Sequence, residues 1–173
     1  GRVYDMEARQ DLTAARLLEL NPDLLTSGAP KASAAEKAPQ AAARTAPRKV
    51  SLAGLPANGA ITWGPVNGPK VVVFSDFQCG YCKKLEEELK AIGARVEERP
   101  ISIFGAESRR DAERVLCAPR PELSLRLAYS DGALVNPKPC DTSGLDANEA
   151  FAKANGFTGT PVLVRPSDGA VLE

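Results

Sequence analysis

The feature that most constrains this chain is a pair of cysteines, three positions apart, between two expected elements. The β-branched run 71–75 predicts a buried strand, and the run 83–90 predicts a helix. Cys79 and Cys82 therefore lie where a strand gives way to a helix. The free N–H groups and the positive dipole end of a first helical turn stabilise a thiolate, which is the form that attacks disulfides. This position predicts redox chemistry, with Cys79 as the exposed nucleophile and Cys82 as the inward-facing resolving thiol.

Composition excludes several other classes of function. The 173 residues include 22 basic and 22 acidic side chains, so the formal net charge is zero. That balance gives no reason to expect nucleic acid or an anionic membrane surface as a partner. No apolar run is long enough for a transmembrane helix. Because the first residue is Gly1 and the only methionine is Met6, we expect a mature or trimmed form.

The pattern of apolar residues predicts a mixed α/β sheet covered by helices. The expected strands are 60–63, 71–75, 95–104, 162–164 and 170–172, and the expected helices are 79–92, 108–118, 122–129 and 146–155. Pro100 lies inside the third of these strands and favours an edge position or a bulge there.

The helix 79–92 has a clear apolar spacing. Leu85, Leu89 and Ile92 recur at helical intervals and are expected to pack on the sheet. Glu86 and Lys90 are expected to form an ion pair on the solvent side.

The second pair of cysteines, Cys117 and Cys140, lies among the later helices. A ring of 24 residues closed by these two would stabilise the fold by about 3.5 kcal/mol, against roughly 2 kcal/mol for the ring between Cys79 and Cys82. The long ring is thus the better staple and the short ring the better reactive disulfide. One alternative is a zinc site made by all four cysteines, although such sites usually take two closely spaced pairs.

Two segments carry a family resemblance. Residues 74–85, FSDFQCGYCKKL, and residues 156–161, GFTGTP, resemble the active-site stretches of bacterial periplasmic disulfide isomerases of the DsbC/DsbG type. The dipeptide Gly80-Tyr81 is associated with the DsbC branch. The resemblance runs from about residue 63 to 172. It implies a thioredoxin-like fold whose helical insertion carries a structural disulfide, here between Cys117 and Cys140.

The resemblance also implies an activity and partners. We expect a thiol-disulfide isomerase or reductase that acts on misoxidised periplasmic proteins, needs no cofactor, and is kept reduced by a DsbD-like membrane donor. A cis peptide bond is expected between Thr160 and Pro161, and these two residues, with Gly80 and Tyr81, would bind the substrate peptide. Family members are homodimers, so a homodimer is expected for the intact protein. A non-catalytic thioredoxin-like chaperone stays open as an alternative.

The organisation of the chain follows from composition and from the resemblance. Residues 1–25 are expected to be the remnant of an N-terminal dimerisation domain, with a short helix over 14–20. Residues 26–52 are rich in Ala and Pro and predict a linker. Residues 53–173 are expected to form the thioredoxin-like catalytic domain, without its C-terminal helix.

Two absences bear on the proton chemistry. The chain has no histidine, so no imidazolium between the cysteines lowers the pKa of Cys79. Val73, six residues before Cys79, stands where thioredoxins carry a buried acid. Proton transfer to and from Cys82 must therefore use another group or water. Asp76 and Glu86 are near in sequence, but both are expected to be solvated surface charges.

Overall fold

The computed structural model describes residues 4–5, 10–11 and 47–173 of the chain. The chain divides into two units, residues 1–45 and 46–173, and the second holds all four cysteines. In the first unit, β1 (Tyr4–Asp5) pairs antiparallel with β2 (Gln10–Asp11). The helix expected over 14–20, and the linker up to residue 46, lie outside the described residues.

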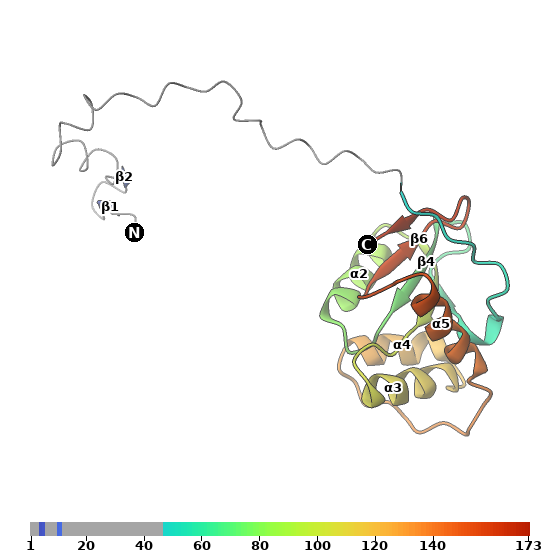
Figure 1. The fold of residues 1–173 in the computed structure, drawn as a ribbon. Coiled ribbons are helices and arrows are strands. Elements are labelled where there is room, and N and C mark those ends of the chain that lie inside the picture. Colours follow the sequence, from blue (N-terminus) through green and yellow to red (C-terminus); the bar gives the residue numbers. More distant parts are fainter. Residues whose placement is uncertain (1–3, 6–9, 12–46) are drawn as a thin grey trace. The chain divides into compact units, whose positions relative to one another are not determined.

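One mixed sheet of five strands forms the centre of the second unit (Figure 1). Its strands are β3 (Ile61–Trp63), β4 (Lys70–Ser75), β5 (Arg95–Pro100), β6 (Val162–Val164) and β7 (Val171–Leu172), in the spatial order β3-β5-β4-β6-β7. Only β4 and β5 are parallel. A parallel pair needs a crossover connection, and the helix that begins directly after Cys79 supplies it. The prediction of a mixed α/β sheet is confirmed.

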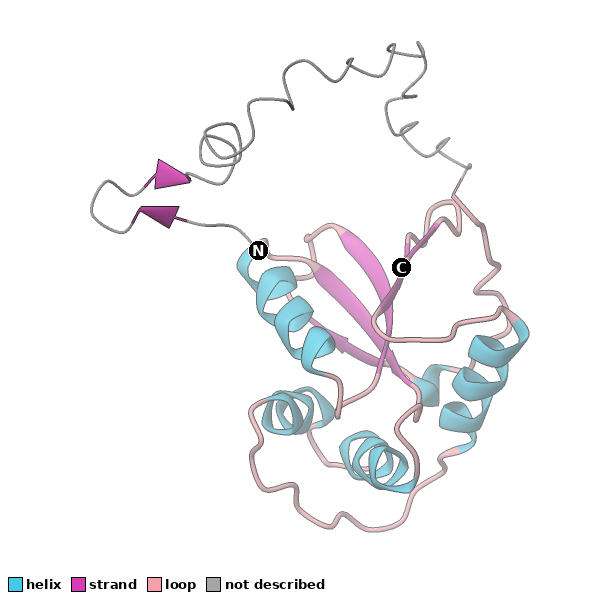
Figure 2. Ribbon diagram, turned by 60° about the vertical axis from the view of Figure 1, so that its left-hand side comes forward, coloured by secondary structure: helices cyan, strands magenta, loops and turns pink. Residues whose placement is uncertain are grey.

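Helices cover the sheet, as Figure 2 shows. They are α2 (Gly80–Ala91), α3 (Ala106–Leu116), α4 (Pro121–Tyr129) and α5 (Ser143–Ala154), with a short 3-10 helix η2 (Ala57–Gly59) before β3. Helix α2 ends before Gly93, whose φ of 66° is the left-handed conformation that favours glycine after a helix. Among the described residues, no helix has both the length and the apolar character to cross a membrane.

Alternation along β4 divides the core into two clusters. Val72 and Phe74 belong to one cluster, which also includes Phe157, three residues after the end of α5. Val73 belongs to the other, which includes Cys82 from α2 and further side chains of α3 and α4. Successive strand residues face opposite sides of a sheet, so α2, α3 and α4 pack on the Val73 side, whereas α5 contributes to both clusters. Cys79 and Cys82 both lie in this second cluster, the one that contains Val73.

The expectation for Pro100 is wrong. Strand β5 lies between β3 and β4 and is not an edge strand. Pro100 is tolerated because it is the last residue of β5, where the strand stops. Ile103 and Phe104, which were expected inside the strand, lie in the loop that follows and are 40% and 59% exposed.

The expected buried face of α2 is also wrong in two places. The buried residues of the helix are Cys82, Glu86 and Leu89, whereas Ile92 is 67% exposed. The helix ends at Ala91, so Ile92 no longer follows the helical spacing. Glu86 follows Cys82 by one turn and therefore lies on the inward face. Its expected ion pair with Lys90 does not occur among the ion pairs of residues 47–173.

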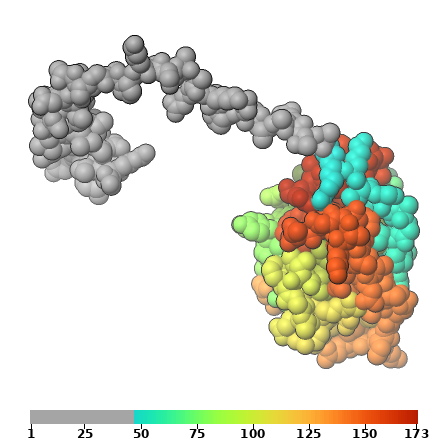
Figure 3. Space-filling model, in the orientation of Figure 1, coloured from blue at the N-terminus to red at the C-terminus, as the bar shows by residue number. Residues whose placement is uncertain are grey.

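The segment just before β3 also belongs to the compact unit, although the sequence placed it in the linker up to residue 52. Lys49 pairs with Ala170, and the Val50 N–H donates to the Gly169 carbonyl at 2.9 Å. Figure 3 shows the α5 region between this segment and the α3 region on one face.

Gly144 of α5 lies against the Gly59 backbone so closely that a Cβ on either residue would collide with the other.

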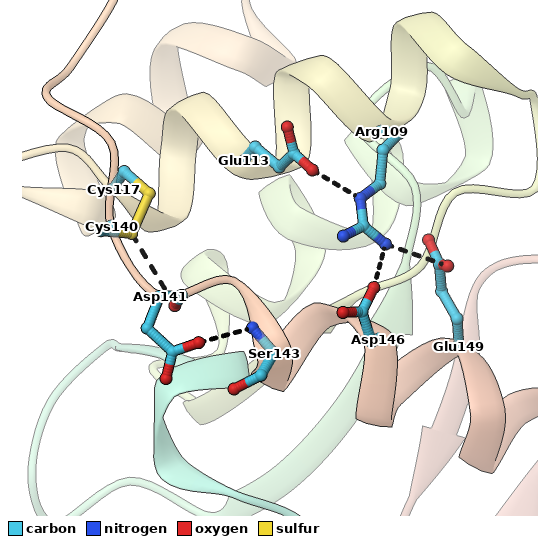
Figure 4. A network of polar contacts seen from close by, with 8 residues as sticks. All are labelled: Arg109, Glu113, Cys117, Cys140, Asp141, Ser143, Asp146 and Glu149. Atoms are coloured by element: carbon cyan, nitrogen blue, oxygen red, sulfur yellow. Dashed lines mark hydrogen bonds and ion pairs between the residues drawn. A yellow bond between two sulfur atoms is a disulfide. The ribbon is translucent and has the colours of Figure 1, made fainter.

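Polar contacts fasten α3 to α5 (Figure 4). The Arg109 guanidinium reaches Asp146 Oδ1 at 2.7 Å and Glu149 Oε2 at 3.2 Å, and also bonds Glu113 within α3. Cys117, directly after α3, forms a disulfide with Cys140, with Cα atoms 5.5 Å apart. Helix α3 is thus held to α5 through Arg109 near its start, and to the loop before α5 through the disulfide at its end.

Candidate redox site

A short buried loop delivers Cys79 to the start of α2. Asp76, directly after β4, is fully buried. Its Oδ1 accepts the Gln78 N–H at 2.9 Å, its Oδ2 accepts the Phe104 N–H at 3.2 Å, and its carbonyl accepts the Cys79 N–H at 3.0 Å. Asp76 therefore ties the loop before α2 to the loop after β5. The expectation that Asp76 and Glu86 are solvated surface charges is wrong for both, since both are buried.

Cys79 caps the N-terminus of α2 with its sulfur. The Cys82 N–H donates to Cys79 Sγ at 3.4 Å, and Cys79 Sγ donates to the Thr160 carbonyl at 3.4 Å. Both thiols are unpaired, and Cys79 and Cys82 are 5% and 2% exposed. The expectation that Cys79 is exposed is therefore wrong, since the Thr160 backbone packs against its sulfur.

The pKa values of the two thiols are shifted in opposite directions. Burial opposes ionisation of Cys79, but hydrogen bonds from the side chains of Thr160 and Cys82 and from the N–H groups of the first turn of α2 favour the thiolate and outweigh it. The pKa of Cys79 is therefore below its ordinary 9.0. For Cys82, burial dominates and raises the pKa to about 12. The arrangement favours a thiolate on Cys79 and a protonated thiol on Cys82.

The other residues predicted to bind substrate lie around Cys79. The Thr160–Pro161 peptide bond is cis and directly precedes β6. Gly80 and Tyr81 form the first turn of α2, and the Tyr81 side chain is 74% exposed. Beside Cys79 is an open pocket of about 290 Å³, lined by residues of α2, α3, α4 and their loops: Phe77, Gln78, Cys79, Gly80, Lys83, Asp111, Arg114, Ala128, Tyr129, Asp131, Gly132 and Leu134.

Comparisons with known proteins agree with this geometry. The chain is 35% identical over 107 residues to the thiol:disulfide interchange protein DsbC of Salmonella typhimurium, which covers 59% of this chain and 44% of that protein. It is 33% identical over 100 residues to DsbC of Escherichia coli, covering 54% and 41%. Over this region the chain is similar to the DsbC proteins. The resemblance stated from the sequence is confirmed, although the chain spans less than half the length of these curated relatives.

Solved structures show the same fold. A disulfide interchange protein from Neisseria gonorrhoeae is 29% identical, with a TM-score of 0.58 over 68% of this chain and 86% of that one. The catalytic domain of Proteus mirabilis ScsC, 22% identical, has a TM-score of 0.54 over 66% and 80% and supports the fold alone. The expected thioredoxin-like fold is confirmed. No protein-family model matches the chain.

The zinc alternative does not fit the cysteines. Cys117 and Cys140 are joined in a disulfide and cannot serve as thiolate ligands. In residues 47–173, as in the short β1–β2 pair, no group of three or more His, Cys, Asp or Glu side chains is arranged to hold a metal ion.

Sequence reasoning missed a buried acid beneath α2. Glu98 of β5 is 2% exposed and accepts hydrogen bonds from three side chains: Trp63, Ser75 and Tyr129. A signal for it was present. Glu97 and Glu98 are consecutive residues of β5, which lies between β3 and β4 in the sheet. Successive strand residues point to opposite faces of a sheet, so one of these two glutamates must face the core.

Proposed function

We propose that residues 46–173 form a thiol-disulfide oxidoreductase domain that reduces and isomerises misoxidised proteins through Cys79 and Cys82. The observation that carries the proposal is a pair of unpaired thiols one helical turn apart at the N-terminus of α2, where the Cys82 N–H donates to Cys79 Sγ. Cys79, with its lowered pKa, is suited to attack, and Cys82, with a pKa of about 12, is held back for resolution.

The chemistry follows in two steps. The Cys79 thiolate attacks a substrate disulfide, forming a mixed disulfide and releasing one substrate thiolate. In isomerisation, another substrate thiol then attacks the substrate sulfur and releases Cys79. In reduction, Cys82 attacks Cys79 Sγ, so the Cys79–Cys82 disulfide forms and the second substrate thiol leaves.

The substrate would lie across the residues next to Cys79. The Thr160 carbonyl contacts Cys79 Sγ at 3.4 Å, so the backbone just before β6 lies next to the sulfur. Together with Gly80 and the exposed ring of Tyr81, this segment offers an extended chain backbone partners and an apolar contact. We assign Cys117 and Cys140 a structural role, since their disulfide fastens the insertion and lies outside the pocket at Cys79.

The cellular location, the electron donor and the oligomeric state are proposed from the similarity to DsbC. They comprise a periplasmic location, re-reduction by a DsbD-like membrane donor, and a homodimer in the intact protein, with residues 1–25 as part of a dimerisation domain and 26–45 as the linker. The relatedness of the catalytic region and the Cys117–Cys140 disulfide, which suits an oxidising compartment, support these assignments.

Refolding of a protein with scrambled disulfides tests the proposal. The reduced wild-type protein should accelerate recovery of the native substrate, and Cys79→Ser should abolish the acceleration. Cys82→Ser should accumulate mixed disulfides with the substrate. The double variant Cys117→Ala/Cys140→Ala, which removes the other two cysteines, is the control and should stay active. Full activity of Cys79→Ser would instead support the non-catalytic chaperone.

A further inference from the structure

Glu98 is a charged side chain deep in the cluster that contains the redox cysteines. It lies on β5 opposite Val73 of β4, in a parallel register that turns both side chains to the same face, the one covered by α2. A buried carboxylate is costly unless it is hydrogen-bonded. The thiol-exchange steps described so far leave this group without a role.

The contacts of Glu98 suit an ionised carboxylate. Its Oε2 accepts from Trp63 Nε1 at 2.7 Å, and its Oε1 accepts from Ser75 Oγ at 2.7 Å and from the Tyr129 hydroxyl. An indole N–H can only donate, and an ionised carboxylate can only accept. Burial raises the pKa of Glu98 above 4.5, which suits a group that takes up a proton and returns it.

Tyr129 bonds this carboxylate and belongs to the cluster that contains the two cysteines. Its side chain is 4% exposed and lies in the same cluster as Cys82. Its ring meets Phe77 edge to face, with centroids 5.2 Å apart, and it lines the pocket beside Cys79. Burial, and then the charge of Glu98, raise the pKa of Tyr129, so its hydroxyl keeps its proton and donates it to Glu98.

Cys82 needs such a partner because its pKa of about 12 keeps the thiol protonated at neutral pH. The other acids near it are Asp76, from the loop before α2, and Glu86, one turn along α2. Asp76 accepts one backbone N–H group on each oxygen, which holds the loop before α2 in place. Asp76 and Glu86 are therefore the two competing carboxyls, and Asp76→Asn and Glu86→Gln test them in the same experiment.

We propose that Tyr129 and Glu98 relay the proton of Cys82, with Glu98 positioning Tyr129 and holding the proton. This inference rests on the proposed function. As Cys82 Sγ attacks Cys79 Sγ in a mixed disulfide, the Cys82 proton passes to the Tyr129 hydroxyl, whose own proton passes to Glu98. The bond between Cys79 and the substrate sulfur breaks, and the Cys79–Cys82 bond forms. The substrate sulfur leaves as a thiolate, so the dithiol is oxidised by two electrons and the substrate disulfide is reduced.

The two steps can be separated with the aromatic disulfide 5,5′-dithiobis(2-nitrobenzoate) and the reduced protein. Attack by Cys79 releases one coloured thiolate in a phase that depends on probe concentration. Attack by Cys82 releases the second in a phase that does not. Glu98→Gln should leave the first phase within about twofold and slow the second by about 100-fold, the scale of a lost proton-transfer partner. The second phase should also lose its pH inflection from the Glu98 carboxyl.

Matched variants exclude a merely structural effect. Glu97→Gln makes the same change one residue earlier, on the opposite face of β5 and beside Arg99, and should change neither phase. Tyr129→Phe keeps the ring, should slow the second phase as Glu98→Gln does, and carries the test if Glu98→Gln does not fold. Asp76→Asn and Glu86→Gln should leave the second phase unchanged.

Three outcomes are distinguishable. A wild-type protein with no fast first phase would overturn the proposed function itself. A normal first phase, with an unchanged second phase in both Glu98→Gln and Tyr129→Phe, would overturn only the relay. A slow second phase confined to Asp76→Asn or Glu86→Gln would also overturn it and assign the proton to that carboxyl.

Discussion

The opposed acidities of Cys79 and Cys82 predict a large difference in alkylation rate. At pH 7, a thiol with a pKa of about 12 is ionised in only about one molecule in 10⁵. A thiol with a pKa below 9.0 is ionised in more than about one in 100. The thiolate fractions thus differ by more than about 1,000-fold.

Intrinsic nucleophilicity offsets part of that ratio. A thiolate of higher pKa is the better nucleophile, with a Brønsted slope of about 0.4–0.5. Over a difference of about three pKa units, this makes the Cys82 thiolate roughly 20-fold more reactive than the Cys79 thiolate. The expected net preference for Cys79 is therefore about 50-fold or more. Lower accessibility widens it further, since Cys82 is 2% exposed against 5% for Cys79.

The assay is timed reaction of the reduced protein with iodoacetamide, followed by quenching and mass analysis of peptides containing each cysteine. The rate for Cys79 should level off below pH 9, whereas the rate for Cys82 should still rise at pH 10. The unfolded protein is the control and should show nearly equal rates. Rates within tenfold of each other in the folded protein at pH 7 would refute the reasoning.

Three further predictions concern stability. Removing the disulfide by Cys117→Ala/Cys140→Ala should lower the free energy of unfolding by about 3.5 kcal/mol in urea titration; a loss under 1 kcal/mol would contradict it. Gly144→Ala adds a Cβ against the η2 backbone and should cost about 1–3 kcal/mol, measured as a lower midpoint in the same titration, whereas an unchanged midpoint would show that this contact can relax. Burial raises the pKa of Glu98, so the folded state keeps this proton to higher pH than the unfolded chain; stability conferred by the protonated form should fall as pH rises from about 4.5 through the folded pKa. Glu98→Gln should remove that slope from unfolding curves measured between pH 4 and 8, and an unaltered slope would contradict the assignment.

Local patterns were enough to predict most of the fold. The apolar runs at β4 and β6 and the turn at Gly93 depend on near neighbours in the chain, and the structure has them where expected. The strand–helix junction placed Cys79 at the N-cap of α2 for the same reason.

The misses at the redox site share a physical cause, because each of them depends on contacts between distant segments. Cys79 is buried because Thr160, 81 residues later, packs on its sulfur. Asp76 is buried because the loop at Phe104 supplies one of its donors. Glu98 is accommodated by partners from β3, β4 and α4, which no single stretch of sequence brings together.

The central claim is that Cys79 and Cys82 cycle between dithiol and disulfide while Cys117–Cys140 stays closed. Equilibration in glutathione buffers of increasing reducing strength, with free thiols counted by alkylation and mass, tests it most directly. The account predicts one two-electron transition that opens only Cys79–Cys82, at a potential near that of the glutathione pool or above it. Four thiols appearing together, or a Cys79–Cys82 pair that never closes, would contradict it.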